Sequence, residues 1–124
     1  MNTNNIETII QEESLSEENW QPLKTLGIDY IFDSGQTALG LSIETANEHN
    51  VYFLLQKGAN ANLHGFDCNP PILDAWFSGK LRIVILLLIY GADPAPLKED
   101  IQFSDIKDSL DIAFRHYKYI GIWQ

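Results

Sequence analysis

The sequence predicts an all-α protein built from stacked helix-turn-helix units. Two stretches, 37–62 and 70–95, share one pattern at a constant offset, which aligns Lys57-Gly58-Ala59-Asn60 with Tyr90-Gly91-Ala92-Asp93. From Gly58 to Gly91 this offset is 33 positions, and each stretch holds two helical apolar patterns, the second ending at one of these glycines. A fixed period of this length is typical of supersecondary units that bury their apolar faces against their neighbours. We therefore expect a solenoid of about four units, with degenerate caps at both ends.

The stretch 37–62 predicts two helices joined by a turn. The first begins after Thr37, whose hydroxyl can accept a hydrogen bond at a helix N-terminus, and reaches about Thr45. Ala46-Asn47 forms the turn. The second helix carries an apolar stripe at i, i+3 and i+4, made of Val51, Leu54 and Leu55. Gly58 ends this helix because glycine takes the left-handed conformation without steric cost.

The stretch 70–95 repeats this arrangement. Pro70-Pro71 suit a helix start, where a missing N–H costs nothing, and Ser78-Gly79 form the turn before a helix that ends at Gly91. The apolar positions are Ile72, Ala75 and Trp76 in the first helix and Leu81, Val84, Leu87 and Leu88 in the second. Residues 59–69 are rich in Asn, Gly, Asp and Pro without a helical period, and predict a hairpin-like finger that projects from the stack.

Both flanks resemble weakened copies of the unit. Trp20, Leu23 and Leu26 precede Gly27-Ile28-Asp29, and Ile6, Ile9 and Ile10 form a short helical stripe before them. Pro22 interrupts the pattern and can start a shorter helix. At the other end, residues 104–119 carry an apolar pattern at helical spacing. The expected units of this single domain are a cap at 1–31, repeats at 32–64 and 65–97, and a cap at 98–124.

These features resemble the ankyrin-repeat family, whose unit reads Thr-Pro-Leu-His-Leu-Ala-Ala, a Gly-His turn, and a leucine-rich helix ending Gly-Ala-Asp-Val-Asn. The matching positions are Thr37, Leu39, Leu41 and 54–62 in the first copy, and Pro71, Ala75, Gly79, Leu81, 83–84 and 86–93 in the second. The resemblance covers the two repeated stretches, whereas the flanks match by pattern alone. It implies a helical solenoid that binds other proteins.

The chain departs from the family pattern at several positions. The family's histidine is Gly40 in one copy and Leu73 in the other, so its inter-repeat hydrogen bonds are absent. Asp74 stands where a buried leucine is usual, and a buried carboxylate needs a partner or shifts its pKa. We favour adjusted packing at Asp74 over a functional site. Glu48 and Asn50 are expected to weaken the second helix of the first copy.

Charge and cysteine content restrict the class of function. The 17 acidic and 8 basic residues give a net charge of -9, which repels nucleic acids and anionic membranes and favours basic partners. The glutamates at positions 7, 12, 13, 17 and 18 form either a solvated helix face or a docking face for a cationic protein. Cys68 is the lone cysteine, and neither a signal peptide nor an apolar run long enough to span a bilayer is visible. We expect a soluble cytoplasmic protein.

The sequence offers no set of residues for catalysis. His49, His64 and His116 lack the spacing of a zinc site, and Cys68 has no visible activating base. No GxSxG, P-loop or GxGxxG motif is present. We therefore expect no catalytic residue, no cofactor and no bound metal.

The resemblance implies partner binding through the finger tips and the adjoining face of the first helices. Carried over position by position, the partner-binding residues are Asp33, Ser34, Gln36, Glu44, Thr45, Phe66, Asp67, Asn69, Phe77 and Ser78. An aromatic ring at such a position either fills a gap in the stack or anchors a partner. Both interpretations stay open for Phe77, whereas partner contact is favoured for Phe66 because it lies in a loop.

A compact, acidic, stand-alone binder is similar to the short ankyrin-type immunity proteins and antitoxins of bacteria. The resemblance implies that it covers the active site of a basic toxin, often a nuclease, and opposite charge raises the rate of such an encounter. The alternative is an ankyrin scaffold or regulatory adaptor, including a secreted effector that binds a host protein. A homo-oligomer through Trp20, Trp123 or the C-terminal tail is a third possibility, although we expect a monomer when no partner is bound.

Overall fold

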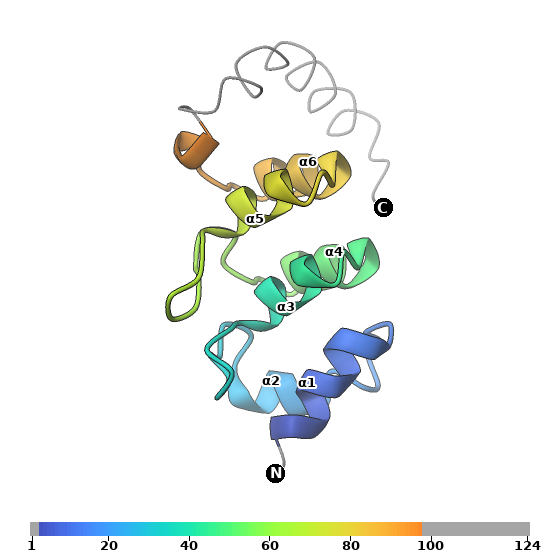
Figure 1. Cartoon of the computed structure of the whole chain (residues 1–124). Coiled ribbons are helices and arrows are strands. Elements are labelled where there is room, and N and C mark those ends of the chain that lie inside the picture. The colour runs from blue at the N-terminus through green and yellow to red at the C-terminus, as the bar shows by residue number, and fades with distance from the viewer. Residues whose placement is uncertain (1–2, 98–124) are drawn as a thin grey trace.

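The computed structural model describes residues 3–97, and all six of its α-helices belong to three stacked pairs (Figure 1). The helices are α1 (Thr3–Glu12), α2 (Gln21–Leu26), α3 (Ala38–Glu44), α4 (Glu48–Gln56), α5 (Pro71–Phe77) and α6 (Leu81–Ile89), followed by the 3-10 helix η1 (Ala95–Leu97). The described part of the chain contains no strand, only one isolated bridge between Ile31 and Thr37. The all-α class is confirmed. The cap expected at 98–124 lies outside the described residues.

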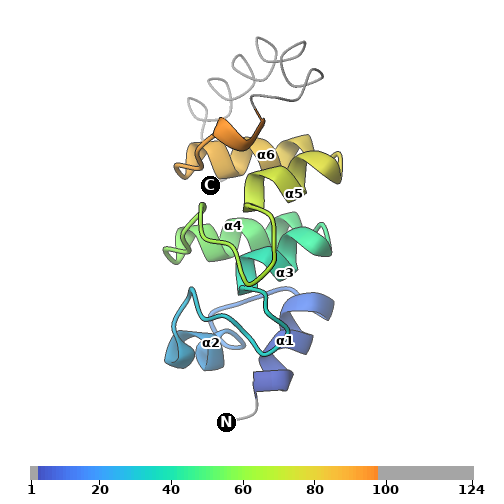
Figure 2. The ribbon, with the colours of Figure 1, turned by 60° about the vertical axis from the view of Figure 1, so that its left-hand side comes forward.

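The first helices of the pairs form one layer and the second helices another. α3 packs against both α1 and α5, and α4 packs against α6 (Figures 1 and 2). The core runs through the whole stack, from Ile6 and Ile10 on α1 to Leu97 in η1, all of them fully buried. Helices this short are marginal in isolation, so contact between neighbouring pairs must supply most of their stability.

The 33-residue period is kept by the helix boundaries themselves. α3 and α5 have seven residues each, α4 and α6 have nine, and the corresponding ends differ by 33 positions. The Thr37 hydroxyl accepts the N–H of Gly40 at 3.0 Å, which confirms its role as the N-cap of α3. Gly58 and Gly91 follow α4 and α6 with φ of 97° and 93°, the left-handed conformation that ends a helix.

The turn between the helices of each pair also needs a left-handed residue. Gly79 supplies it after α5 with φ 74°, whereas the equivalent residue after α3 is Ala46 with φ 54°. A side chain at positive φ is strained because its Cβ approaches the backbone. Ala46 therefore strains the turn of the α3–α4 pair, whereas Gly79 avoids this strain in the α5–α6 pair.

Exchanging the residue type at these two turns should change stability in opposite directions. We expect Ala46→Gly to stabilise the protein by about 0.5–1 kcal/mol and Gly79→Ala to destabilise it by about 1 kcal/mol. No atom lies within 4 Å of a Cβ built on Gly79, so the backbone conformation alone sets the cost there. Urea unfolding of both variants measures the difference, and a stabilising Gly79→Ala would contradict this account.

The N-terminal pair differs from the other two, as the sequence indicated. Pro22 lies in the first turn of a six-residue α2, where its missing N–H removes no helical bond, and the shorter helix is confirmed. The stripe on α1 is also confirmed, because Ile6 and Ile10 are fully buried and Ile9 packs beside them.

α4 forms over nine residues with Asn50 in its first turn, and the Asn50 side chain makes tertiary contacts that the sequence-based expectation did not include. Its side chain is fully buried, and its Oδ1 accepts the N–H of Leu15 at 2.7 Å. Its Nδ2 donates to the carbonyl oxygens of Ile10 at 3.0 Å and Glu13 at 2.8 Å. These three bonds satisfy backbone groups at the end of α1 and join the N-terminal pair to the next pair.

Candidate functional site

Two loops project on the same side of the stack and carry the candidate site (Figures 1 and 2). We call residues 28–37 the first finger and residues 59–70 the second finger. Each tip is a tight turn: the Gly35 N–H donates to the Phe32 carbonyl at 2.8 Å, and the Cys68 N–H donates to the Gly65 carbonyl at 3.4 Å. Gly35 and Cys68 are separated by the same offset as the helix ends, so the fingers obey the period of the helices. The expected finger at 59–69 is confirmed as non-helical.

The two fingers are bonded to each other close to their tips. The Phe66 N–H donates to the Gly35 carbonyl at 2.8 Å, and the Cys68 thiol lies 3.6 Å from the same carbonyl oxygen. A Cβ on Gly65 would lie 1.8 Å from the Gly35 oxygen, so only glycine allows the fingers this close. The backbone that carries the second tip is therefore held in place before any partner arrives.

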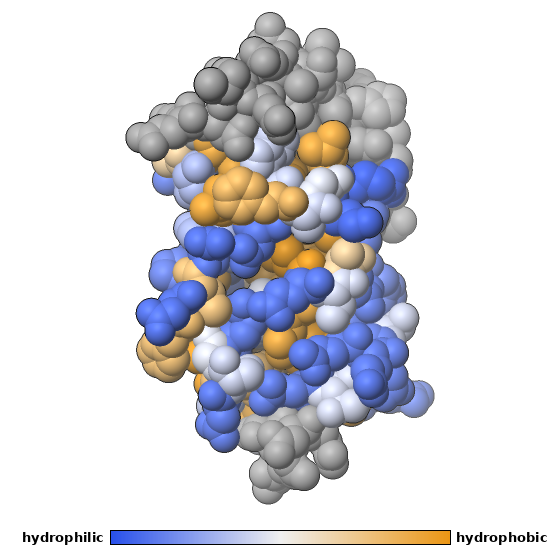
Figure 3. Space-filling view, in the orientation of Figure 1, coloured by the Kyte–Doolittle hydropathy of each residue, from blue (hydrophilic) through white to orange (hydrophobic). Residues whose placement is uncertain are grey.

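The side chains of Phe66 and Phe77 are exposed to solvent. Phe66 is 72% exposed at the second tip, and Phe77 is 66% exposed at the end of α5. Figure 3 shows a hydrophobic surface over α5 beside the hydrophilic middle of this face. A ring that fills a gap in the stack would be buried, so the gap-filling interpretation fails for both residues. Asp67, next to Phe66, is exposed with φ 55°, a conformation that a side chain rarely adopts.

The other expected partner-binding residues are exposed, with one exception. They are Asp33 and Ser34 at the first tip, Glu44 and Thr45 at the end of α3, Asp67 and Asn69 in the second finger, and Ser78 after α5. The hydroxyl groups of Thr45 and Ser78 donate to carbonyl oxygens of their own helices, at 3.1 Å to Leu41 and 2.8 Å to Ala75. The carboxylates of this surface are thus more available than these two hydroxyl groups for hydrogen bonds to a partner.

Gln36 is the exception, and its expected place on the exposed surface is corrected. Its side chain is only 6% exposed and lies in the space that a side chain at position 40 would occupy. A Cβ on Gly40 would lie 2.0 Å from the Gln36 Oε1. That oxygen accepts the Thr37 N–H at 3.1 Å, and the Gln36 Nε2 donates to Glu44 at 3.0 Å. Gln36 therefore supports Glu44 from within.

Asp74 has a partner of its own within the second finger. The Asn69 Nδ2 donates to the Asp74 Oδ1 at 3.1 Å, and the Asp74 side chain is only half-buried. A half-buried carboxylate with a hydrogen bond needs no further ligand. This contact supports the adjusted-packing interpretation of Asp74.

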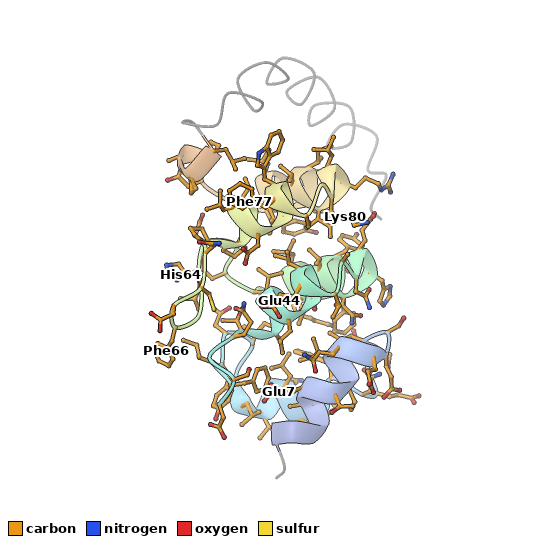
Figure 4. The ribbon with its side chains drawn as sticks, viewed as in Figure 1. Glu7, Glu44, His64, Phe66, Phe77 and Lys80 are labelled. Carbon is orange, nitrogen blue, oxygen red and sulfur yellow. The ribbon has the colours of Figure 1, made fainter. Side chains whose placement is uncertain are left out.

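Sequence reasoning placed Glu7 in an acidic group that forms either a solvated helix face or a docking face, but it did not connect Glu7 to the fingers. In the view of Figure 4, Glu7, Glu44 and Phe77 lie one above another on α1, α3 and α5, with Phe66 and His64 on the second finger beside them. The 33-residue offset does not extend to α1, so no repeat alignment could place Glu7. The only available signal was the absence of basic residues near it in the sequence.

The opposite layer carries ion pairs and aromatic contacts. The Lys57 ammonium bonds to Glu17, and this hydrogen bond holds the pKa of the exposed Glu17 carboxyl below its usual value. The same ammonium lies 5.1 Å from the ring centre of Trp20 and 5.3 Å from that of Phe53. Directly after α6, desolvation and the neighbouring Tyr52 raise the pKa of Tyr90.

The described residues contain no group of three His, Cys, Asp or Glu side chains that could hold a metal ion. Within residues 3–97, no helix has the length and apolar content needed to cross a membrane. Comparison of the chain with family models, with curated proteins and with solved structures gives no match.

Proposed function

We propose that the protein is a non-enzymatic binding module for another protein, built as an ankyrin-type solenoid. The observation that carries this proposal is the exposed Phe66 ring on a finger whose backbone is already fixed by hydrogen bonds. Large exposed aromatic side chains on rigid backbone are typical anchors of protein interfaces, because little conformational entropy is lost on binding.

The ankyrin-type assignment is supported by geometry as well as by residues. Helix pairs of equal length recur every 33 positions, each pair after the first is preceded by a finger, and the pairs stack layer on layer (Figure 1). Each unit buries its apolar face only against its neighbours, which is the arrangement of a repeat protein.

Within this class, an immunity or antitoxin role fits the molecule best. The expected ligand is a basic toxin domain whose active site the fingers would cover, in the cytoplasm of the producing cell. Opposite charge can raise an association rate by orders of magnitude above a neutral baseline of about 10⁵–10⁶ M⁻¹s⁻¹, and a toxin must be captured quickly. A toxin gene next to this one, and rescue of toxin-treated cells by the protein, would support the role; an adaptor would give neither.

Truncating Phe66 should separate binding from folding. We expect Phe66→Ala to leave the melting temperature nearly unchanged, because 72% of the ring is exposed, and to weaken partner binding by about 30-fold or more. Calorimetry with the co-purified partner measures both quantities.

Leu81→Ala is the matched control for this test. Leu81 is an apolar residue, 42% exposed, at the start of α6 and away from the finger tips. Its truncation should leave binding unchanged. Equal loss of affinity in the two variants, or unfolding of Phe66→Ala, would contradict the assignment of the second finger to the proposed interface.

A further inference from the structure

Each helix-turn-helix unit requires particular residues where its backbone leaves the common conformations. The turn inside the unit uses a left-handed residue, which is Ala46 with φ 54° in one pair and Gly79 with φ 74° in the next. The position 33 residues after Gly79 is Ile112. A β-branched side chain at positive φ is strongly disfavoured. The segment 98–124, which lies beyond the described residues, is therefore unsuited to another turn of this kind.

The residues needed for a further finger are missing as well. A Cβ on Gly65 would lie 1.8 Å from the Gly35 carbonyl oxygen, so the second finger needs glycine where it meets the first. The equivalent positions 33 residues later are Lys98 and Cys68. In the same arrangement the Lys98 side chain would collide with the Cys68 carbonyl group. We therefore expect the row of fingers to end at the second finger.

The hydrogen bonds at the base of the fingers stop at the same unit. The Asp29 carboxylate accepts the N–H of Asn60 at 2.9 Å, and the Asn62 Oδ1 accepts the N–H of Asp93 at 2.7 Å. Both bonds join one unit to the next, and they are related by the 33-residue offset. The next equivalent side chain is Ala95, which has no acceptor. The turn, the finger and these bonds thus all lack the residues for a unit after the α5–α6 pair.

α6 nevertheless requires a cover on its remaining side. Residues 83–87 are all buried, and five consecutive residues go more than once around a helix, so no side of this turn is open to water. Its main neighbours among the described helices are α4 and α5. On α4, the equivalents of the buried Ile85 and Leu86 are Tyr52 and Phe53, which are only half-buried. Because a helix that is apolar all round is stable only when it is enclosed, α6 needs a neighbour that α4 lacks.

Residues 104–119 have the composition of that neighbour. They contain neither glycine nor proline, and their apolar side chains fall on one side at helical spacing. These side chains are Ile106, Leu110, Ala113, Phe114 and Tyr117. The connection 98–103 spans at most about 20 Å and starts beside the buried Leu97 in η1, which packs against α5. The segment is therefore within reach of α6.

We propose that residues 104–119 form one uninterrupted helix, which runs through the turn position 112 and packs its apolar stripe against the side of α6 that α4 and α5 leave open. The stack then ends in a single helix instead of a fourth helix pair. This arrangement leaves the end of α5 uncovered, in agreement with the 66% exposure of Phe77. The proposal concerns how the stack is closed, so it holds with or without the binding function proposed above.

Two variants at position 112 test the single helix in the full chain. Ile112 lies off the apolar stripe, so its replacement changes mainly the backbone preference. Glycine is less favourable than alanine inside a helix, so the folding equilibrium constant of Ile112→Ala should exceed that of Ile112→Gly about fivefold. Urea unfolding measures both constants. Equal constants, or the reverse order that a left-handed turn at this position produces, would overturn the proposal.

A photo-crosslink tests which surface the helix covers. In the full-length protein, p-benzoylphenylalanine replaces either Phe114 in the stripe or Asp108 on the opposite side, and peptide mass spectrometry locates the crosslinks formed on irradiation. The probe at Phe114 should crosslink to residues 83–90 of the same molecule in several-fold higher yield than the probe at Asp108. Crosslinks to α5 or the second finger, equal yields from the two probes, or no crosslink would overturn the assignment. Crosslinks between two molecules would make a second copy of the chain the occupant and would overturn it as well.

Discussion

Asn50→Asp is expected to destabilise the fold by about 3–5 kcal/mol at pH 7. The two side chains have nearly the same shape, but a carboxylate cannot donate to the Ile10 and Glu13 carbonyl oxygens, which lie 3.0 and 2.8 Å from the Asn50 Nδ2. The substitution places a negative charge at a fully buried position facing two acceptors. Urea unfolding followed by circular dichroism measures the loss.

The pH dependence of the same variant gives a second readout. Burial raises the pKa of an introduced carboxyl, so its charged form is the destabilising one. The folded-state pKa then exceeds the unfolded value, and the deficit relative to the parent should shrink as the pH falls through the folded-state pKa. Asn60→Asp is the matched control, because exposed Asn60 uses its side-chain oxygen to accept the Asn62 N–H, which aspartate can also do. A decrease in the free energy of unfolding below about 1 kcal/mol for Asn50→Asp would contradict the role of Asn50 in linking the α1–α2 pair to the α3–α4 pair.

Leu54→Ala and Leu87→Ala should each destabilise the protein by about 2–5 kcal/mol. The two leucines are 33 positions apart on α4 and α6, and both are fully buried. Truncation removes buried methyl groups and leaves a cavity between helix layers that cannot close completely. Against a total stability of typically about 5–15 kcal/mol, either loss is severe.

Leu81→Ala is the control on the same helix, since Leu81 is 42% exposed and should cost well under about 1 kcal/mol. Equilibrium urea denaturation of the three variants tests the repeat equivalence directly. Similar small losses for Leu54 and Leu87 would mean that the 33-residue alignment does not mark the core.

Much of the fold could be predicted because its signals are local. Thr37 caps α3, Gly58 and Gly91 follow α4 and α6 in the left-handed conformation, and Pro71 lies in the first turn of α5, each through backbone chemistry that depends on a few neighbouring residues. The exposure of Phe66 also followed from its place in a loop.

Sequence reasoning missed the environment of two residues. One makes hydrogen bonds to residues far away in the sequence, and the other fills the space beside a glycine. Asn50 weakens an isolated helix by propensity, yet its partners lie 35 to 40 positions away on the N-terminal pair. Gln36 looked exposed by repeat alignment, but the lack of a side chain at Gly40 opened a space that draws it inward.

The sequence by itself determined the repeated unit: the helix lengths, their caps, their turns and the acidic composition. Only the tertiary structure decided which polar groups are buried between helix pairs and which remain exposed on the fingers. The physical reason is that periodicity and capping are set within a few residues. Burial and hydrogen-bond satisfaction depend instead on how the stacked pairs place distant residues together.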